Sequence, residues 1–128
     1  MRGFFRTSPG AGLLLLLCLP FLGCQSALAG AMASYEDARY PTAAAQFRAA
    51  EPEARALGAP ELARYALYRG LTHLALGDAR AAARWVGYAK QRADRDPLLF
   101  NDQDRGALLA AWRSMGHMPG EPAFASPD

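Results

Sequence analysis

Two sets of mostly small apolar residues recur 39 positions apart in this chain, and they constrain its fold more than any other feature. The sets are Tyr40, Ala43, Phe47, Ala50 and Ala79, Ala82, Val86, Ala89. Within each set the spacings are three, four and three residues, which place all four side chains on one face of an α-helix. β-branched residues are scarce, so a sheet-based fold is disfavoured. The pattern therefore predicts an all-α protein whose helices pack through small side chains.

Glycine, proline and capping residues divide the chain into short helices. Pro41 suits the first turn of a helix, and Gly58 ends that helix. Gly77 suits a helix C-terminus, while Asp78 and Asn101 suit N-caps. We therefore expect helices over residues 29–39, 41–57, 61–76, 79–95 and 102–116.

The second set resembles part of the tetratricopeptide repeat (TPR), a unit of about 34 residues that pairs two antiparallel helices. The resemblance runs from Gly70 through Gly77-Asp78 to Ala82 and Ala89, and the two units together cover about residues 30–96. It implies a short right-handed α-solenoid of about two TPR-like units, with the C-terminal helix as a cap.

The first unit departs from the TPR pattern. Ala38 stands where the turn glycine belongs, and the 39-residue spacing implies a longer second helix or loop around residues 55–59. Pairs of helices joined by small residues also occur in other bundles, so an unrelated array of α-hairpins is the alternative.

The N-terminus has a basic start and an apolar run that are typical of a secretion signal. Arg2 and Arg6 precede a leucine-rich run over residues 13–22, which is too short to span a ~30 Å hydrocarbon core. At its end, Phe21-Leu22-Gly23-Cys24 resembles the lipobox of bacterial lipoproteins. The resemblance implies that a signal peptide over 1–23 is removed and that Cys24 is acylated with fatty-acid chains such as palmitate.

The residues after Cys24 bear on location and on a second cleavage site. Gln25 follows the cysteine, and by resemblance to Gram-negative lipoproteins this residue favours the outer membrane. Residues 24–29 then form a short tether. However, Ala27-Leu28-Ala29 is also an A-x-A ending, and cleavage there would release a soluble protein that begins at Gly30.

Leu67, Leu71 and Leu74 form an apolar stripe on the predicted helix 61–76. They lie close to positions that line the concave groove in TPR proteins, so they form either a peptide groove or a covered part of the core. Burial is the usual fate of such stripes. Arg64 and Tyr68 lie on the remaining surface of the same helix.

Trp85 and Tyr88 lie with Arg92 on the flank of the predicted helix 79–95. An aromatic pair beside an arginine is typical of a binding hot spot. The interpretation that we favour from the sequence is that the pair packs on the last helix, whose stripe consists of Leu108, Trp112 and Met115. The candidate partner-binding residues are thus Arg64, Leu67, Tyr68, Leu71, Trp85 and Tyr88.

Residue types that carry catalysis or bind metals do not cluster in the sequence. His73 faces the interface of a helix pair, and His117 has no second group of ligands at metal-binding spacing. Neither a phosphate-binding loop nor a Ser/His/Asp arrangement is evident. We therefore expect no enzymatic activity, no small-molecule substrate, no cofactor and no metal. The net charge of +2 is too small to indicate nucleic-acid binding.

Together these features predict one helical domain over residues 30–116, followed by a flexible tail over 117–128. We expect a module that is lipid-anchored at the bacterial outer membrane, faces the periplasm and binds another envelope protein or peptide. The alternative is a soluble periplasmic structural subunit, cleaved after Ala29, that oligomerises through its apolar stripes.

Overall fold

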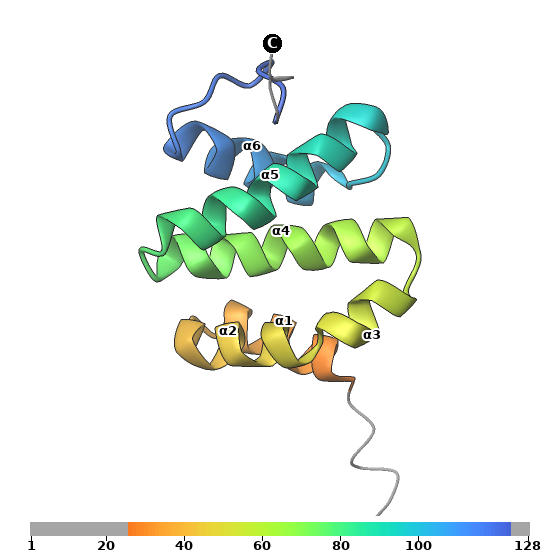
Figure 1. Cartoon of the computed structure of the whole chain (residues 1–128), viewed down its shortest axis with the longest axis vertical. Coiled ribbons are helices and arrows are strands. Elements are labelled where there is room, and N and C mark those ends of the chain that lie inside the picture. Colours follow the sequence, from red (N-terminus) through yellow and green to blue (C-terminus); the bar gives the residue numbers. More distant parts are fainter. Residues whose placement is uncertain (1–25, 124–128) are drawn as a thin grey trace, which may run out of the picture.

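The computed structural model of the protein describes residues 26–123, and this part of the chain is all-helical (Figure 1). Cys24, with the expected signal peptide, lies outside the described residues. The helices are α1 (Ala27–Glu36), α2 (Tyr40–Ala49), α3 (Glu51–Ala56), α4 (Ala59–Ala75), α5 (Ala79–Arg95) and α6 (Asp102–Ser114). Helix α4 lies at the centre, where it packs against all five of the others.

Capping residues fix several of these boundaries as expected. Asp78 accepts a hydrogen bond from the backbone N–H of Ala81 and so caps α5. Asn101 accepts one from Asp104 in the same way and caps α6. Gly77, in the turn between α4 and α5, has a φ of 75°, which glycine adopts without steric cost.

The corresponding turn between α1 and α2 contains a strained residue. Ala38 has a φ of 56°, a left-handed conformation that a Cβ atom disfavours by about 1 kcal/mol or more. Ala38 thus adopts the conformation that the turn glycine was expected to supply.

We predict that Ala38→Gly stabilises the protein by about 0.5–1 kcal/mol, because it removes this strain at a modest cost in unfolded-state entropy. The reciprocal change, Gly77→Ala, should destabilise by a similar amount, since no atom lies within 4 Å of a Cβ there and only the backbone is affected. Urea unfolding of both variants measures the two effects. A destabilised Ala38→Gly protein would contradict the strain at Ala38.

The recurring residues of the sequence pack into one core. The last three members of each set are fully buried: Ala43, Phe47, Ala50, Ala82, Val86 and Ala89. The first members differ, because Tyr40 is half-buried and Ala79 is exposed. Helix α4 crosses α5 closely at Gly70, where an added Cβ would lie 2.6 Å from Val86 Cγ2 and 2.8 Å from the Val86 backbone nitrogen. The missing side chain at Gly70 therefore allows the two helices to approach closely.

The helix expected over residues 41–57 is divided in two at Ala50. Pro52 has no N–H with which to continue the helix, and its ring would crowd the carbonyl of Arg48. Ala50 therefore ends α2 and also begins α3, which has Pro52 in its first turn. The turn at Leu57–Gly58, which follows α3, lies within residues 55–59, where the 39-residue spacing led us to expect a longer second helix or a loop.

The ends of the domain also differ from expectation. The tether expected over 24–29 is shorter, because Ala27–Ala29 already belong to α1. The tail expected to be flexible from residue 117 is held against the domain up to Ala123. Trp112 Nε1 donates to the carbonyl of Met118 at 3.0 Å, and the buried Lys90 Nζ donates to that of Glu121 at 3.0 Å. Residues 124–128 lie outside the described part.

Candidate functional site

A groove runs between α3 and α5 and has α4 as its floor. Its deeper hollow, of about 230 Å³, is lined by Glu51, Arg55, Leu62, Tyr65, Arg84, Trp85, Tyr88 and Gln91. A more open hollow of about 350 Å³ shares Arg84 and Trp85 with the first and is lined further by Arg48, Arg69, His73, Asp78, Arg80 and Ala81. We call the two hollows together the Trp85 groove.

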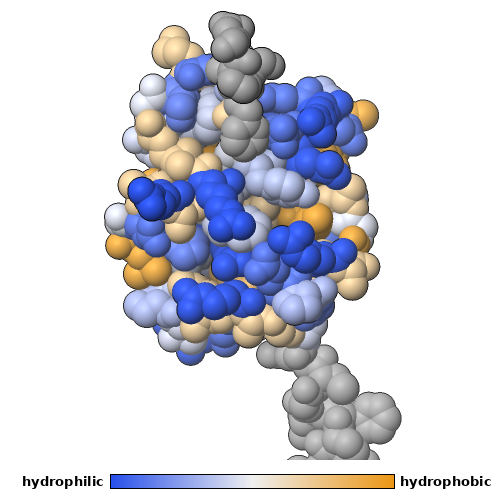
Figure 2. All heavy atoms as spheres, viewed as in Figure 1, coloured by the Kyte–Doolittle hydropathy of each residue, from blue (hydrophilic) through white to orange (hydrophobic). Residues whose placement is uncertain are grey.

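The helices that line most of the groove, α3, α4 and α5, lie on the near side of the molecule in Figure 1, with α1 and α6 behind them. Figure 2 shows hydrophilic residues over much of this side, with smaller hydrophobic patches among them. The groove is lined by five arginines but only two carboxylates, so it is basic although the chain as a whole is close to neutral.

Aromatic rings that pack edge to face form the floor of the deeper hollow. Tyr65 of α4 packs edge-on against Phe47 of α2 at 5.8 Å between ring centroids, and against Trp85 of α5 at 5.7 Å. The Tyr65 hydroxyl donates a hydrogen bond of 2.8 Å to the carbonyl of Phe47. These contacts join three helices through one buried side chain, and they hold Trp85 at the groove in a fixed orientation.

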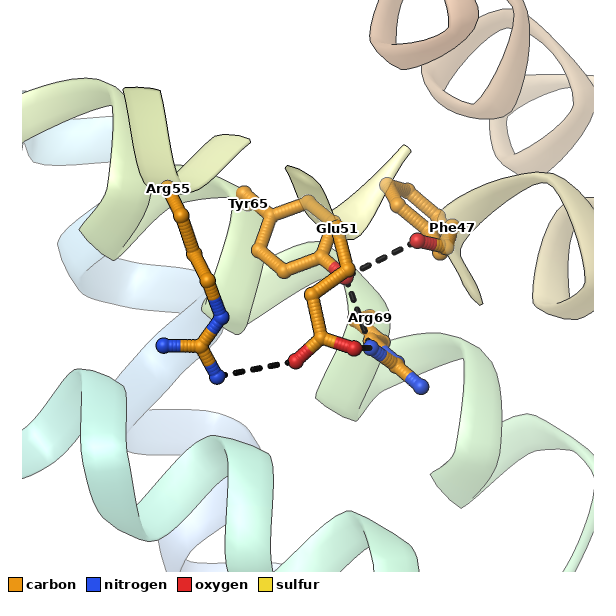
Figure 3. A network of polar contacts seen from close by, with 5 residues as sticks. All are labelled: Phe47, Glu51, Arg55, Tyr65 and Arg69. Atoms are coloured by element: carbon orange, nitrogen blue, oxygen red, sulfur yellow. Dashed lines mark hydrogen bonds and ion pairs between the residues drawn. The ribbon is translucent and has the colours of Figure 1, made fainter. Parts of the chain in front are cut away.

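A network of charges lies beside these rings (Figure 3). Arg69 Nη1 donates to the Tyr65 hydroxyl at 2.7 Å and lies 3.4 Å from Glu51 Oε2. Glu51 also pairs with Arg55, at 2.9 Å. The Arg69 guanidinium lies 4.3 Å from the centre of the Trp85 ring. Two arginines therefore share one carboxylate, and the cluster keeps a net positive charge.

The protonation states of this network follow from its contacts. The hydrogen bond from Arg55 lowers the pKa of Glu51, so this carboxylate is ionised at neutral pH. Burial raises the pKa of Tyr65, against the opposing effect of Arg69, so the phenol stays protonated. Arg69 itself is 8% exposed, and its Nε has no hydrogen-bond partner among the described residues. Its charge is thus incompletely compensated inside the protein.

The open end of the groove is more strongly basic. His73 lies 3.6 Å from Asp78, but burial, together with Arg69 and Arg48, lowers the pKa of His73. The imidazole is therefore neutral at pH 7, and the positive charge here comes from arginines. Within the described part of the chain, Arg48, Arg80 and Arg84 form no ion pair with a carboxylate.

The lining of the groove combines aromatic rings with guanidinium groups. Residues 26–123 contain no group of three or more His, Cys, Asp or Glu side chains that could hold a metal ion. The deeper hollow, of about 230 Å³, is below the ~300–1,000 Å³ of typical small-molecule pockets, whereas the open hollow, of about 350 Å³, falls within that range. The deeper hollow is the size of an inserted side chain, with an aromatic wall and guanidinium groups at its rim.

Of the predicted partner-binding residues, the structure brings Trp85 and Tyr88 together in this groove. Leu67 is fully buried in the core, so its assignment as a binding residue is wrong. Leu71 and Leu74 are half-buried and pack against the same core. Successive side chains of an α-helix point in directions 100° apart. All three leucines therefore lie on the side of α4 opposite Tyr65 and Arg69, away from the Trp85 groove.

Arg64 and Tyr68 belong to a separate contact between α4 and α6. The buried Asp104 accepts hydrogen bonds from the Tyr68 hydroxyl at 2.7 Å and from Arg64 Nε at 3.1 Å. Burial and this bond to Asp104 raise the pKa of Tyr68 to about 12. Tyr68 is 8% exposed and holds α6 in place, so it is not available to a partner, whereas Arg64 remains half exposed.

The interpretation favoured from the sequence, that Trp85 packs on the last helix, is wrong. Trp85 packs on Tyr65 and Arg69 of α4. It is Lys90, on another face of α5, that lies over Trp112 of α6, at 5.6 Å. The aromatic residues of α5 and α6 therefore serve different contacts.

Sequence reasoning missed Glu51, Tyr65 and Arg69 as residues of this site. A signal was present, because Tyr65, Arg69 and His73 recur at four-residue intervals along one face of α4. The partner of that face, α3, could not be placed from the sequence because the break at Ala50 was not expected.

In comparisons with known proteins, no protein-family model, curated protein or solved structure matches the chain. Within the described residues, no helix combines the length and the apolar character that crossing a membrane requires.

Proposed function

We propose that this protein is a non-catalytic protein–protein interaction module of the bacterial envelope, anchored at the outer membrane by lipid on Cys24. The observation that carries the proposal is the Trp85 groove, which combines a fixed aromatic wall with unpaired arginines. Rigid aromatic residues and arginines are the side chains that contribute most to binding at protein interfaces.

We further propose that the helices form a right-handed TPR-like solenoid. Its two helix pairs are α1–α2 and α4–α5, and α6 caps the second pair. Two features support it. Ala43, Phe47 and Ala50 in the α2 region are fully buried, and so are Ala82, Val86 and Ala89, which follow them by 39 residues in α5. Ala31, which precedes Gly70 by the same 39 residues, is also fully buried. Each pair thus presents small residues where its helices meet.

The start of α1 supports cleavage before Cys24 over cleavage after Ala29. The Ser26 hydroxyl caps α1 by accepting a hydrogen bond from the Ala29 backbone N–H at 3.0 Å. Leu28 packs against the core, and its N–H donates to Glu53 at 3.3 Å. Cleavage after Ala29 would remove this cap and the first turn of the helix, whereas cleavage before Cys24 leaves both in place.

We predict that Cys24→Ala releases the protein from membranes. The several acyl chains of a lipoprotein each contribute ~0.8 kcal/mol per buried CH₂, so their loss removes the anchor. Fractionation after a high-salt wash measures attachment, and mass spectrometry of the wild-type N-terminus identifies the mature residue. An N-terminus at Gly30, or a Cys24→Ala protein that still sediments with membranes, would contradict lipid anchoring.

The binding function is tested by photo-crosslinking in cells. We expect p-benzoylphenylalanine in place of Gln91, in the groove, to form an adduct with a different protein. The same group in place of Ala110, exposed on α6, serves as the control and should form none. An adduct of the chain with itself would instead favour the oligomerising subunit. Equal labelling from both positions, or none from residue 91, would contradict the proposal.

A further inference from the structure

We propose that the Trp85 groove binds an acidic peptide segment that inserts one apolar side chain beside Trp85. This inference rests on the proposed function and specifies the chemistry of the partner. The charge, the shape and the aromatic wall of the groove each contribute to it.

The charge of the groove calls for an anionic occupant. Arg48, Arg80 and Arg84 come from two different helices and have no carboxylate partner within the described residues. Arg69 adds a buried charge that shares Glu51 with Arg55. Carboxylates of a bound peptide would complete the pairing that the fold leaves open, with the planar geometry that guanidinium groups favour.

The deeper hollow selects an apolar group on that occupant. Leu62, Tyr65, Trp85 and Tyr88 supply its apolar lining. Tyr65 is tied to Phe47 and Arg69 by hydrogen bonds, and Trp85 packs on Tyr65, so the hollow is formed before a ligand arrives. A preformed pocket of this kind binds a side chain without first having to order its own walls.

The shape of the groove favours a peptide over an anionic membrane surface. The aromatic rings lie at the base of a hollow flanked by α3 and α5, where an extended chain can enter. Membrane-binding helices instead present their apolar residues outward, so that these residues enter the lipid. Trp85 is 8% exposed and cannot do so without leaving Tyr65.

The test uses the full-length lipidated protein in detergent micelles. The probe is a fluorescent peptide of aspartate, glutamate and serine with one central leucine, followed by anisotropy. We expect Arg48→Gln and Arg84→Gln each to weaken binding by about two- to fivefold, and by on the order of tenfold together. Arg113→Gln, on the exposed part of α6, removes the same charge outside the groove and should leave affinity unchanged.

Replacing the central leucine of the probe by serine, or its acids by lysine, should also reduce binding, and added salt should weaken it. Equal losses from Arg113→Gln and Arg84→Gln, or an affinity indifferent to the leucine, would overturn the inference. So would displacement of the peptide when phosphatidylglycerol is mixed into the micelles, which would assign the groove to a membrane. If residue 91 crosslinks a partner but the peptide fails to bind, the proposed interaction function is supported and the proposed acidic ligand is contradicted.

Discussion

Gly70→Leu should destabilise the protein strongly, because α4 and α5 touch at this position. A single Cβ would already lie 2.8 Å from the backbone nitrogen of Val86, and a backbone atom cannot rotate aside as a side chain can. The two helices would have to separate, which costs about 1–3 kcal/mol or more for overpacking and disrupts the core around Val86. Thermal unfolding followed by circular dichroism at the helix band measures the loss.

Gly70→Ala tests the helix contact at this position more specifically, because it adds only one methyl group. Replacing glycine by alanine inside a helix is normally favourable by about 1 kcal/mol. Gly106 lies on the exposed surface of α6, where a Cβ would meet no atom within 4 Å, so Gly106→Ala should raise the melting temperature. The same substitution should lower it at Gly70. If Gly70→Ala and Gly106→Ala both raised the melting temperature, the helices would not meet at Gly70.

Local chemistry explains why much of the fold could be predicted from the sequence. Asp78, Asn101 and Gly77 each determine a helix end through groups within a few residues, and these are interactions that a sequence shows directly. The close approach at Gly70 could be predicted for a similar reason, because a missing side chain within an apolar helix face leaves few alternatives.

The candidate site depends on contacts between distant segments, and most of it could not be predicted. Glu51 meets Arg69 only because the chain breaks at Ala50 and α3 then turns toward α4. Periodicity assigns Trp85 to a flank of α5 but does not say which neighbour covers that flank. Periodicity likewise left the Leu67 stripe open between a groove and the core, because it does not say which neighbouring helix covers Leu67, which is 0% exposed.

Replacing Leu67 by aspartate should cause a severe loss of stability at neutral pH. Leu67 is 0% exposed, so the new carboxylate would lie in the core without a partner. Truncating a buried leucine alone costs about 2–5 kcal/mol, and a domain of this size has only about 5–15 kcal/mol of stability. The buried charge adds to that loss.

The leucines of this chain provide a graded series for the same substitution. Leu71, half-buried against the core, should show an intermediate loss as Leu71→Asp. Leu98 is 89% exposed, and Leu98→Asp should melt with the wild type because its carboxylate stays hydrated. Melting temperatures that fall in the order Leu98, Leu71, Leu67 would assign the stripe to the core.

The pH dependence of the Leu67→Asp variant separates charge from lost packing. Burial raises the pKa of an aspartate, so the folded state would bind a proton more tightly than the unfolded state does. The stability deficit relative to wild type should then be smallest below about pH 4, where the carboxyl is neutral in both states, and should grow as the pH rises. A deficit that does not change with pH would mean that the new carboxylate reaches water. In that case Leu67 would face an accessible groove, and the leucine stripe, rather than Trp85, would be the first place to look for a bound partner.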